Sequence, residues 1–105
     1  MPLVARRVVA SVNKVTYEER KAIYEAALEK WGELAQTMVA IEEMSELTKE
    51  ICKLHRGKRD MDDLADEIAD VTIMLEQLRL IYDINDLVCA HMDAKVLRLQ
   101  ERVAR

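Results

Sequence analysis

The chain has 105 residues, enough for one domain that buries roughly two thirds of its unfolded surface, and too few for a second. Half of the residues are hydrophobic and 34% are charged, with two glycines, one proline and no phenylalanine, a composition that favours helices over sheets. A net charge of −4 argues against a general nucleic-acid-binding surface, and no apolar run is long enough for a membrane span. We therefore expect a single all-α domain over residues 1–105, with an N-terminal arm at 1–15, a helical bundle at 16–104, and no nucleic-acid or membrane partner.

The two cysteines, Cys52 and Cys89, lie in predicted helices and lack the CxxC spacing of zinc or redox sites. Free cysteines are among the most buried residues, so both are expected as reduced thiols in the core. Reduced thiols, and the absence of an apolar leader segment after Arg6 and Arg7, predict a cytoplasmic protein.

The first predicted helix begins at a capping box. Thr16 and Glu19 have the spacing at which a hydroxyl and a carboxylate satisfy backbone donors at a helix start. The helix should run from about residue 17 to about residue 30 and end near Trp31-Gly32, because glycine weakens a helix by about 1 kcal/mol.

The second predicted helix covers about residues 33–55 and is amphipathic. One broad side is apolar and consists of Leu34, Met38, Ile41, Met44, Leu47, Ile51 and Leu54. The other side gathers Glu42, Glu43, Glu46 and Glu50. Taken alone, an acidic stripe opposite an apolar one is typical of a solvated helix face.

The third predicted helix follows Asp60, a good N-cap residue, and runs to about Ile81. Glu67 falls inside its apolar arc, close to Val71, and no lysine or arginine occupies the helix before Arg79. A buried carboxylate needs compensation, so a cation or a basic group from another helix should meet Glu67. The helix is apolar over much of its circumference, which indicates cover on more than one side and predicts that subunits complete one another.

Two carboxylate pairs recur at helical spacing, Glu43 with Glu46 and Glu67 with Asp70. Residues three apart lie on one helix face, so the pairs converge if the second and third helices pack antiparallel. Each like-charge pair at about 4 Å costs about 4 kcal/mol at an effective dielectric constant of about 20. Bound Mg²⁺ or Mn²⁺ would relieve this repulsion, because oxygen ligands without histidine or thiolate suit hard cations.

The fourth predicted helix covers about residues 86–103. Its apolar seam consists of Val88, Met92, Val96, Leu99 and Val103. Beside the seam run His91, Lys95, Arg98 and Arg102. This basic stripe is either an ordinary solvated face whose cations complement the helix dipole, or a set of phosphate-binding residues.

These features together resemble a known family. The pattern EExxE at Glu42, Glu43 and Glu46, followed by ExxD at Glu67 and Asp70, is similar to the signature of the MazG-like all-α nucleoside triphosphate pyrophosphohydrolases. The similarity covers about residues 31–102 and includes Trp31-Gly32, Gln36 and the stretches 69–78 and 95–99.

The resemblance implies a four-helix bundle of the MazG type, completed as a homodimer or homotetramer. It implies hydrolysis of a nucleoside triphosphate to the monophosphate and pyrophosphate, in the removal of unwanted nucleotides. The implied cofactor is Mg²⁺, with Mn²⁺ as a substitute, bound by Glu43, Glu46, Glu67 and Asp70.

The resemblance also implies roles for the remaining residues. All five acids of the motif are catalytic candidates, and Glu42 or one of the metal-binding acids would orient the attacking water. The resemblance places Lys95 and Arg98 near the substrate phosphates, and helical spacing adds Arg102 to the same stripe. Independently of the resemblance, Trp31 and Gln36 are candidates for the base side of the nucleotide.

Two alternatives remain open on the sequence. One is a non-catalytic helical oligomerisation or regulatory module that keeps the bundle, although the presence of all five acids argues against it. The other is a related all-α pyrophosphatase that acts on dUTP, dCTP or a phosphoribosyl nucleotide. The base pocket that distinguishes these substrates is not defined by the sequence.

Overall fold

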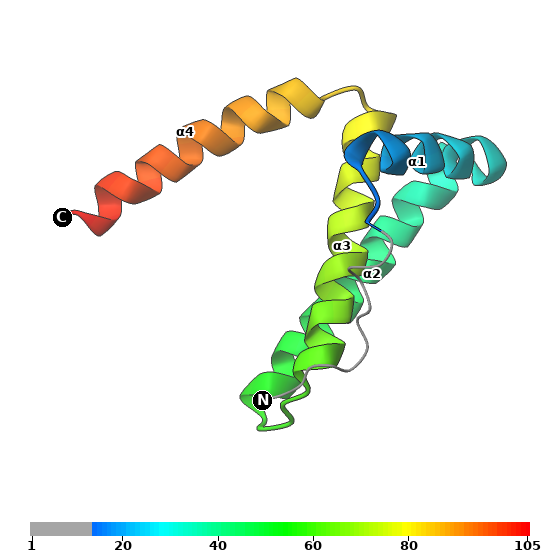
Figure 1. Ribbon diagram of the computed structural model, residues 1–105. Coiled ribbons are helices and arrows are strands. Elements are labelled where there is room, and N and C mark those ends of the chain that lie inside the picture. Colours follow the sequence, from blue (N-terminus) through cyan, green and yellow to red (C-terminus); the bar gives the residue numbers. More distant parts are fainter. Residues whose placement is uncertain (1–13) are drawn as a thin grey trace.

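The fold is all-helical over residues 14–105, the part of the chain that the structure, a computed structural model, describes (Figure 1). This range contains no strand and has four helices, which are α1 (Tyr17–Trp31), α2 (Glu33–His55), α3 (Met61–Ile81) and α4 (Asn85–Val103). The all-α prediction is confirmed, and each helix end lies within about one residue of its predicted position. The predicted N-terminal arm falls almost wholly outside the described residues.

Local hydrogen bonds fix the starts of two helices. At α1, the Thr16 hydroxyl accepts from the backbone N–H of Glu19, and the Glu19 carboxylate accepts from the backbone N–H of Thr16. At α3, the Asp60 carboxylate accepts from two backbone N–H groups of the first turn. Between α1 and α2, Gly32 has a φ of 91°, which favours glycine, so the chain turns there without steric strain.

The helices α2 and α3 form an antiparallel hairpin, which is the main packing unit of the chain (Figure 1). Its core contains Ala40 of α2 and Val71 and Met74 of α3. In the same interface the Gln36 side-chain amide donates to the Gln77 carbonyl oxygen at 2.7 Å, and both side chains are buried. The small Ala40 side chain leaves little bulk between the helices, so this core is thin.

A charged contact fastens α1 to α3. Arg20 donates from Nε and Nη2 to the two carboxylate oxygens of Glu76 at 2.9 and 3.0 Å, and the Tyr24 hydroxyl donates to the same carboxylate. The Arg20 hydrogen bonds, with that of Tyr24, hold the pKa of Glu76 below its ordinary value. Burial, together with the hydrogen bond to Glu76, raises the pKa of Tyr24 to about 12. These three residues are called the α1 clamp below.

The helix α4 extends away from the hairpin (Figure 1), and none of its residues is buried. The turn before it contains Asp83 at a φ of 53°, and the Ile84 backbone N–H donates to the Arg79 carbonyl at 3.0 Å. Because none of the residues of α4 is buried, the helical bundle of residues 14–105 is open on the side of α4.

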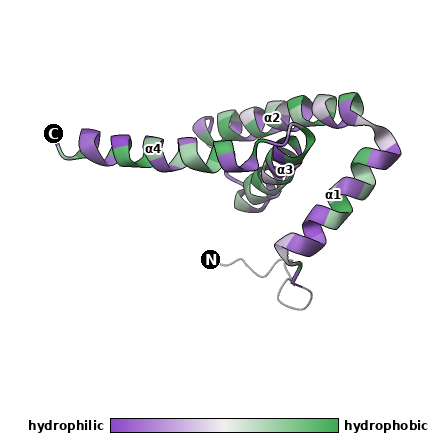
Figure 2. Cartoon of the chain, turned by 90° about the horizontal axis from the view of Figure 1, so that it is seen from above, coloured by the Kyte–Doolittle hydropathy of each residue, from purple (hydrophilic) through white to green (hydrophobic). Residues whose placement is uncertain are grey.

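Apolar residues also line the outside of the hairpin. The side of α2 that contains Gln36, Ala40 and Glu43 faces α3. The large apolar residues of α2 that are exposed are Leu34, Met38, Ile41, Met44 and Ile51. Figure 2 shows hydrophobic residues recurring along α4 as well. None of the four described helices is both long and apolar enough to cross a membrane.

The prediction that both cysteines are core thiols is wrong for the single chain, because Cys52 and Cys89 are exposed. Both lie on helices whose apolar residues are themselves largely uncovered, α2 and α4. Their helical positions were predicted correctly. The prediction was wrong about which side of each helix the rest of the chain covers.

Candidate metal centre

Three carboxylates from two helices meet inside the hairpin. One oxygen each from Glu43 of α2 and from Glu67 and Asp70 of α3 lies within 4.8 Å of the other two. All three residues are half-buried. The predicted convergence of acids across antiparallel helices is therefore present for these three members, which are called the acidic triad below.

The helix register explains this convergence. Glu43 lies seven residues after Gln36, and Asp70 lies seven residues before Gln77. The Gln36–Gln77 hydrogen bond and the Glu43–Asp70 approach are thus about two turns apart along one antiparallel interface. Glu67 lies one turn before Asp70 on the same face of α3. The buried amide pair therefore sets the register that brings the acids together.

Glu67 gives the clearest indication that a ligand belongs at this position. Its Oε1 atom is buried and has no hydrogen-bond partner among residues 14–105. The ion pairs found within this range lie elsewhere, between Arg20 and Glu76 and between Lys53 and Glu50. A buried carboxylate oxygen without a partner is costly, so a cation would stabilise this arrangement.

The acidic triad holds its protons more tightly than ordinary carboxylates do. Burial raises the pKa of Glu67, and the charges of Asp70 and Glu43 raise it further. Burial also raises the pKa of Glu43, with the charge of Asp70 next in importance. The pKa of Asp70 is raised by burial and by the charge of Asp66. Protons and a divalent cation should therefore compete for the same oxygens.

The other predicted acids, Glu42 and Glu46, are exposed on α2. The triad does not include Glu46, although its charge acts on Glu43 from about one turn away. Sequence reasoning missed Asp66, whose charge acts on Asp70. The signal was available, because residues four apart on a helix share a face.

The predicted substrate-binding residues lie away from the triad. Lys95, Arg98 and Arg102 are exposed on α4, which extends away from the hairpin, so a single chain does not bring them to the acids (Figure 1). Trp31 is 58% exposed at the end of α1. Gln36 is buried against Gln77, so in this conformation it offers no open amide to a nucleotide base.

The chemistry of the donor set fits a hard divalent cation. The acidic triad supplies only carboxylate oxygens, and the orphaned Oε1 of Glu67 is an acceptor without a donor in the described chain. Mg²⁺ suits such a set because it binds through a few carboxylates and keeps positions for water or phosphate. Comparisons with protein-family models, curated proteins and solved structures gave no match.

Proposed function

We propose that this chain is a Mg²⁺-dependent nucleoside triphosphate pyrophosphohydrolase of the MazG-like type, which forms the monophosphate and pyrophosphate. The observation that carries the proposal is the convergence of Glu43, Glu67 and Asp70 between antiparallel helices, where Oε1 of Glu67 lacks a partner among residues 14–105. The EExxE and ExxD spacing, which resembles that family, contains the same three residues.

The acids have separate roles in this proposal. Glu43, Glu67 and Asp70 hold the cation, and the exposed Glu46 adds a fourth carboxylate from the next turn of α2. When bound, Mg²⁺ supplies positive charge that neutralises phosphate oxygens. Glu42, which is exposed and precedes Glu43 in the sequence, or one of the metal-binding acids would orient the attacking water and accept its proton.

The direct test is incubation of the full chain with Mg²⁺ and a panel of canonical and modified nucleoside triphosphates, followed by separation of the products. We expect a monophosphate and pyrophosphate, with ¹⁸O from solvent water in the monophosphate. Solvent label in orthophosphate would place attack at the γ phosphate and contradict the proposal.

A matched pair of variants connects activity to the acidic triad. Glu67→Gln preserves the shape of the side chain but removes its charge, so it should keep the helical fold and abolish hydrolysis. Glu29→Gln removes an exposed carboxylate of α1 and should retain activity. Equal activity in both variants would show that the triad is not the reactive site.

A non-catalytic helical assembly module is the second candidate, favoured by the exposed apolar residues of α2 and α4. Calorimetric titration with Mg²⁺, with and without a non-hydrolysable triphosphate, separates the candidates. Cation binding without hydrolysis of any nucleotide would favour the module. The absence of cation binding in both titrations would remove the enzymatic proposal.

A further inference from the structure

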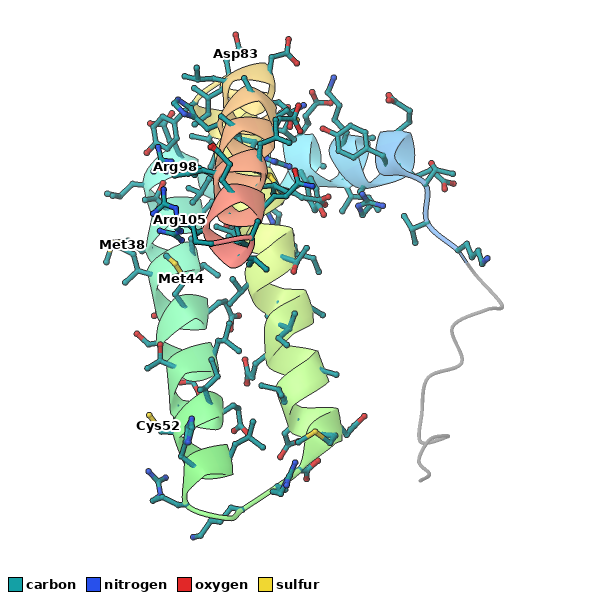
Figure 3. All side chains as sticks on the ribbon, turned by 90° about the vertical axis from the view of Figure 1, so that its left-hand side faces the viewer. Met38, Met44, Cys52, Asp83, Arg98 and Arg105 are labelled. Atoms are coloured by element: carbon teal, nitrogen blue, oxygen red, sulfur yellow. The ribbon has the colours of Figure 1, made fainter. Side chains whose placement is uncertain are left out.

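A groove with a volume of about 430 Å³ lies in the elbow between α3 and α4. Figure 1 shows α4 diverging from the end of α3, and in Figure 3 the same helix projects toward the viewer, from the labelled Asp83 to Arg105. The apolar residues that line the groove are Leu75 and Leu78 of α3, Ile84 of the turn, and Val88 and Met92 of α4. Small-molecule pockets typically measure about 300–1,000 Å³, so the groove has room for a small apolar ligand.

Local backbone geometry builds this groove within one chain. The Ile84 N–H donates to the Arg79 carbonyl at 3.0 Å, and the Val88 N–H donates to the Ile84 carbonyl at 2.9 Å. From Ile84 the lining continues at four-residue spacing through Val88 to Met92, which places these residues on one side of the chain. On α3 the lining runs from Thr72 to Arg79, about 10 Å at 1.5 Å per residue. The groove therefore suits an elongated ligand about two helical turns long.

Two charged residues of α3 line the groove, and they differ in their partners. The carboxylate of Glu76 already accepts hydrogen bonds from Arg20 and Tyr24. Arg79 is half-buried, and its Nη2 atom lies 3.4 Å from the sulfur of Met92, which is a weak acceptor. The charge of Arg79 also acts on Glu76, but the ion pairs among residues 14–105 do not include Arg79. Arg79 is therefore a partly desolvated cation beside an apolar groove, without an ion-pair partner in that range.

The chemistry of the groove indicates which ligand would complement it. A guanidinium binds a carboxylate through two parallel hydrogen bonds, and one unpaired cation matches a single negative charge. The apolar walls require an apolar body attached to that charge. Residues 1–13 contain no aspartate or glutamate and carry Arg6 and Arg7, so they supply no anion for Arg79. The complement is therefore an amphipathic monoanion from outside the chain.

We infer that the groove between α3 and α4 binds an amphipathic monocarboxylate of the medium-chain fatty acid type. The alkyl chain lies along the apolar walls, and the carboxylate accepts hydrogen bonds from the guanidinium of Arg79 at the edge of the groove. The site is separate from the acidic triad, because Arg79 follows Asp70 by about two and a half turns and so lies on the opposite face of α3. It does not depend on the proposed function. A bound fatty acid contacts both helices and thereby fixes the direction of α4.

Titration of the full chain with decanoate, followed by NMR of the backbone amides, is the first test. The titration is made without divalent cations and below the concentration at which decanoate forms micelles. We expect saturable binding of one decanoate per chain, with the largest shifts in residues 72–92. Affinity should rise about fourfold for each methylene between hexanoate and decanoate, because each one buries further apolar surface. Shifts centred on residues 96–103 would overturn the inference, as would the absence of saturable binding, which is the result expected if a second copy of the chain fills the groove.

The substitution Arg79→Gln tests the anionic head of the ligand. It should weaken decanoate binding by about tenfold or more, because hydrogen bonds to a charged group are lost. Binding of decanol, which lacks the carboxylate, should be unchanged. Arg56→Gln is the matched control, because it removes the same charge from an exposed position at the other end of the hairpin. Equal loss of decanoate binding in the two variants would assign the effect to net charge and reject the site at Arg79.

A blocked groove tests where the alkyl chain lies. Val88→Phe adds bulk inside the groove and should abolish the binding of decanoate and decanol alike. Leu87→Phe is its control, because Leu87 is 57% exposed and does not line the groove, so this variant should bind both ligands as wild type does. Equal binding in the two phenylalanine variants would place the ligand elsewhere and overturn the inference. Hydrolysis assays on the wild-type protein report separately on the proposed function.

Discussion

Gln36 and Gln77 meet inside the hairpin, where the amide of Gln36 donates to the side-chain oxygen of Gln77 across 2.7 Å. Both residues are buried in an otherwise apolar stretch next to Ala40 and Met74. A buried polar pair has favourable energy only when both partners are in register. The pair therefore favours the one alignment of α2 and α3 in which Glu43 approaches Asp70.

Breaking this amide pair from one side should destabilise the hairpin. We expect Gln36→Leu or Gln77→Leu to lower the free energy of unfolding by about 1–3 kcal/mol, because each leaves one buried amide without a partner. The double variant should be less affected than the sum of the two single variants. Denaturant unfolding measures all three, with Gln100→Leu on exposed α4 as the control. Additive losses would show that the two amides act independently.

Mg²⁺ should stabilise the wild-type protein but not Glu67→Gln. At a free concentration about 100-fold above the Kd, binding to the folded state alone adds about 2.7 kcal/mol. Without metal, Glu67→Gln should melt at a higher temperature than wild type, because it removes one member of a repulsive cluster. Calorimetry with and without Mg²⁺ checks both statements. Equal stabilisation of the two proteins by Mg²⁺ would locate the cation elsewhere.

The acidic triad predicts an unusual dependence of stability on pH in the absence of metal. Because the pKa of Glu67 is raised in the folded protein, its contribution is fully present below the ordinary pKa and is lost as the pH rises through the folded value. The stability of wild type relative to Glu67→Gln should therefore fall as the pH rises above about 4, the ordinary pKa of a glutamate. Urea unfolding at a series of pH values above and below this point measures the difference. A constant difference would mean that the Glu67 pKa is the same in both states.

For Glu76 in the α1 clamp, we expect stability to depend on pH in the opposite direction. Its pKa is lowered in the folded protein, chiefly by Arg20, so its contribution is present above the ordinary pKa and is lost as the pH falls through the folded value. We expect Glu76→Gln to cost about 1–3 kcal/mol at neutral pH, and less in acid. Unfolding curves at pH 7 and in acid report this change, with Glu25→Gln on the exposed side of α1 as the control. A cost independent of pH would assign the effect to packing.

The basic stripe of α4 is tested by Lys95→Ala. If Lys95 contacts substrate phosphate, the variant should lower kcat/KM for the triphosphate by about tenfold to hundredfold, the effect of losing roughly 1.4–2.8 kcal/mol in the transition state. Its affinity for Mg²⁺ alone should not change, because the lost contact is to substrate. Lys21→Ala on α1 is the matched control. Unchanged kinetics in Lys95→Ala would identify the stripe as a solvated face.

The positions of the helices were predictable because their ends depend on nearby residues. Thr16 and Asp60 bond to backbone groups two or three residues away, and Gly32 adopts the conformation that its missing side chain permits. The meeting of Glu43 with Asp70 was predictable for a similar reason. It needs only helical spacing in each helix and an antiparallel pairing of consecutive helices.

The covered side of α2 was not predictable from its amphipathic pattern. The larger apolar arc, with Leu34 and Ile41, remains exposed, while α3 packs on the arc of Gln36 and Ala40. The pattern indicates that one arc of the helix is apolar. It does not indicate whether the same chain or another one covers that arc. The direction of α4 was equally unpredictable. It depends on the short turn at Asp83, and the sequence pattern did not predict the positive φ of that residue.

The hairpin and the α1 clamp differ in the length of the chain segment that separates their contacting residues. The helices of the hairpin are consecutive and joined by a short turn, so their contacts have low contact order and can form rapidly. The bond from Arg20 to Glu76 spans 56 residues and must wait for a much larger loop to close. During folding, the acidic triad should therefore come together before α1 packs on α3 through the α1 clamp. The like-charge repulsion then acts on the earliest compact species, so divalent cations should speed folding as well as stabilise its product.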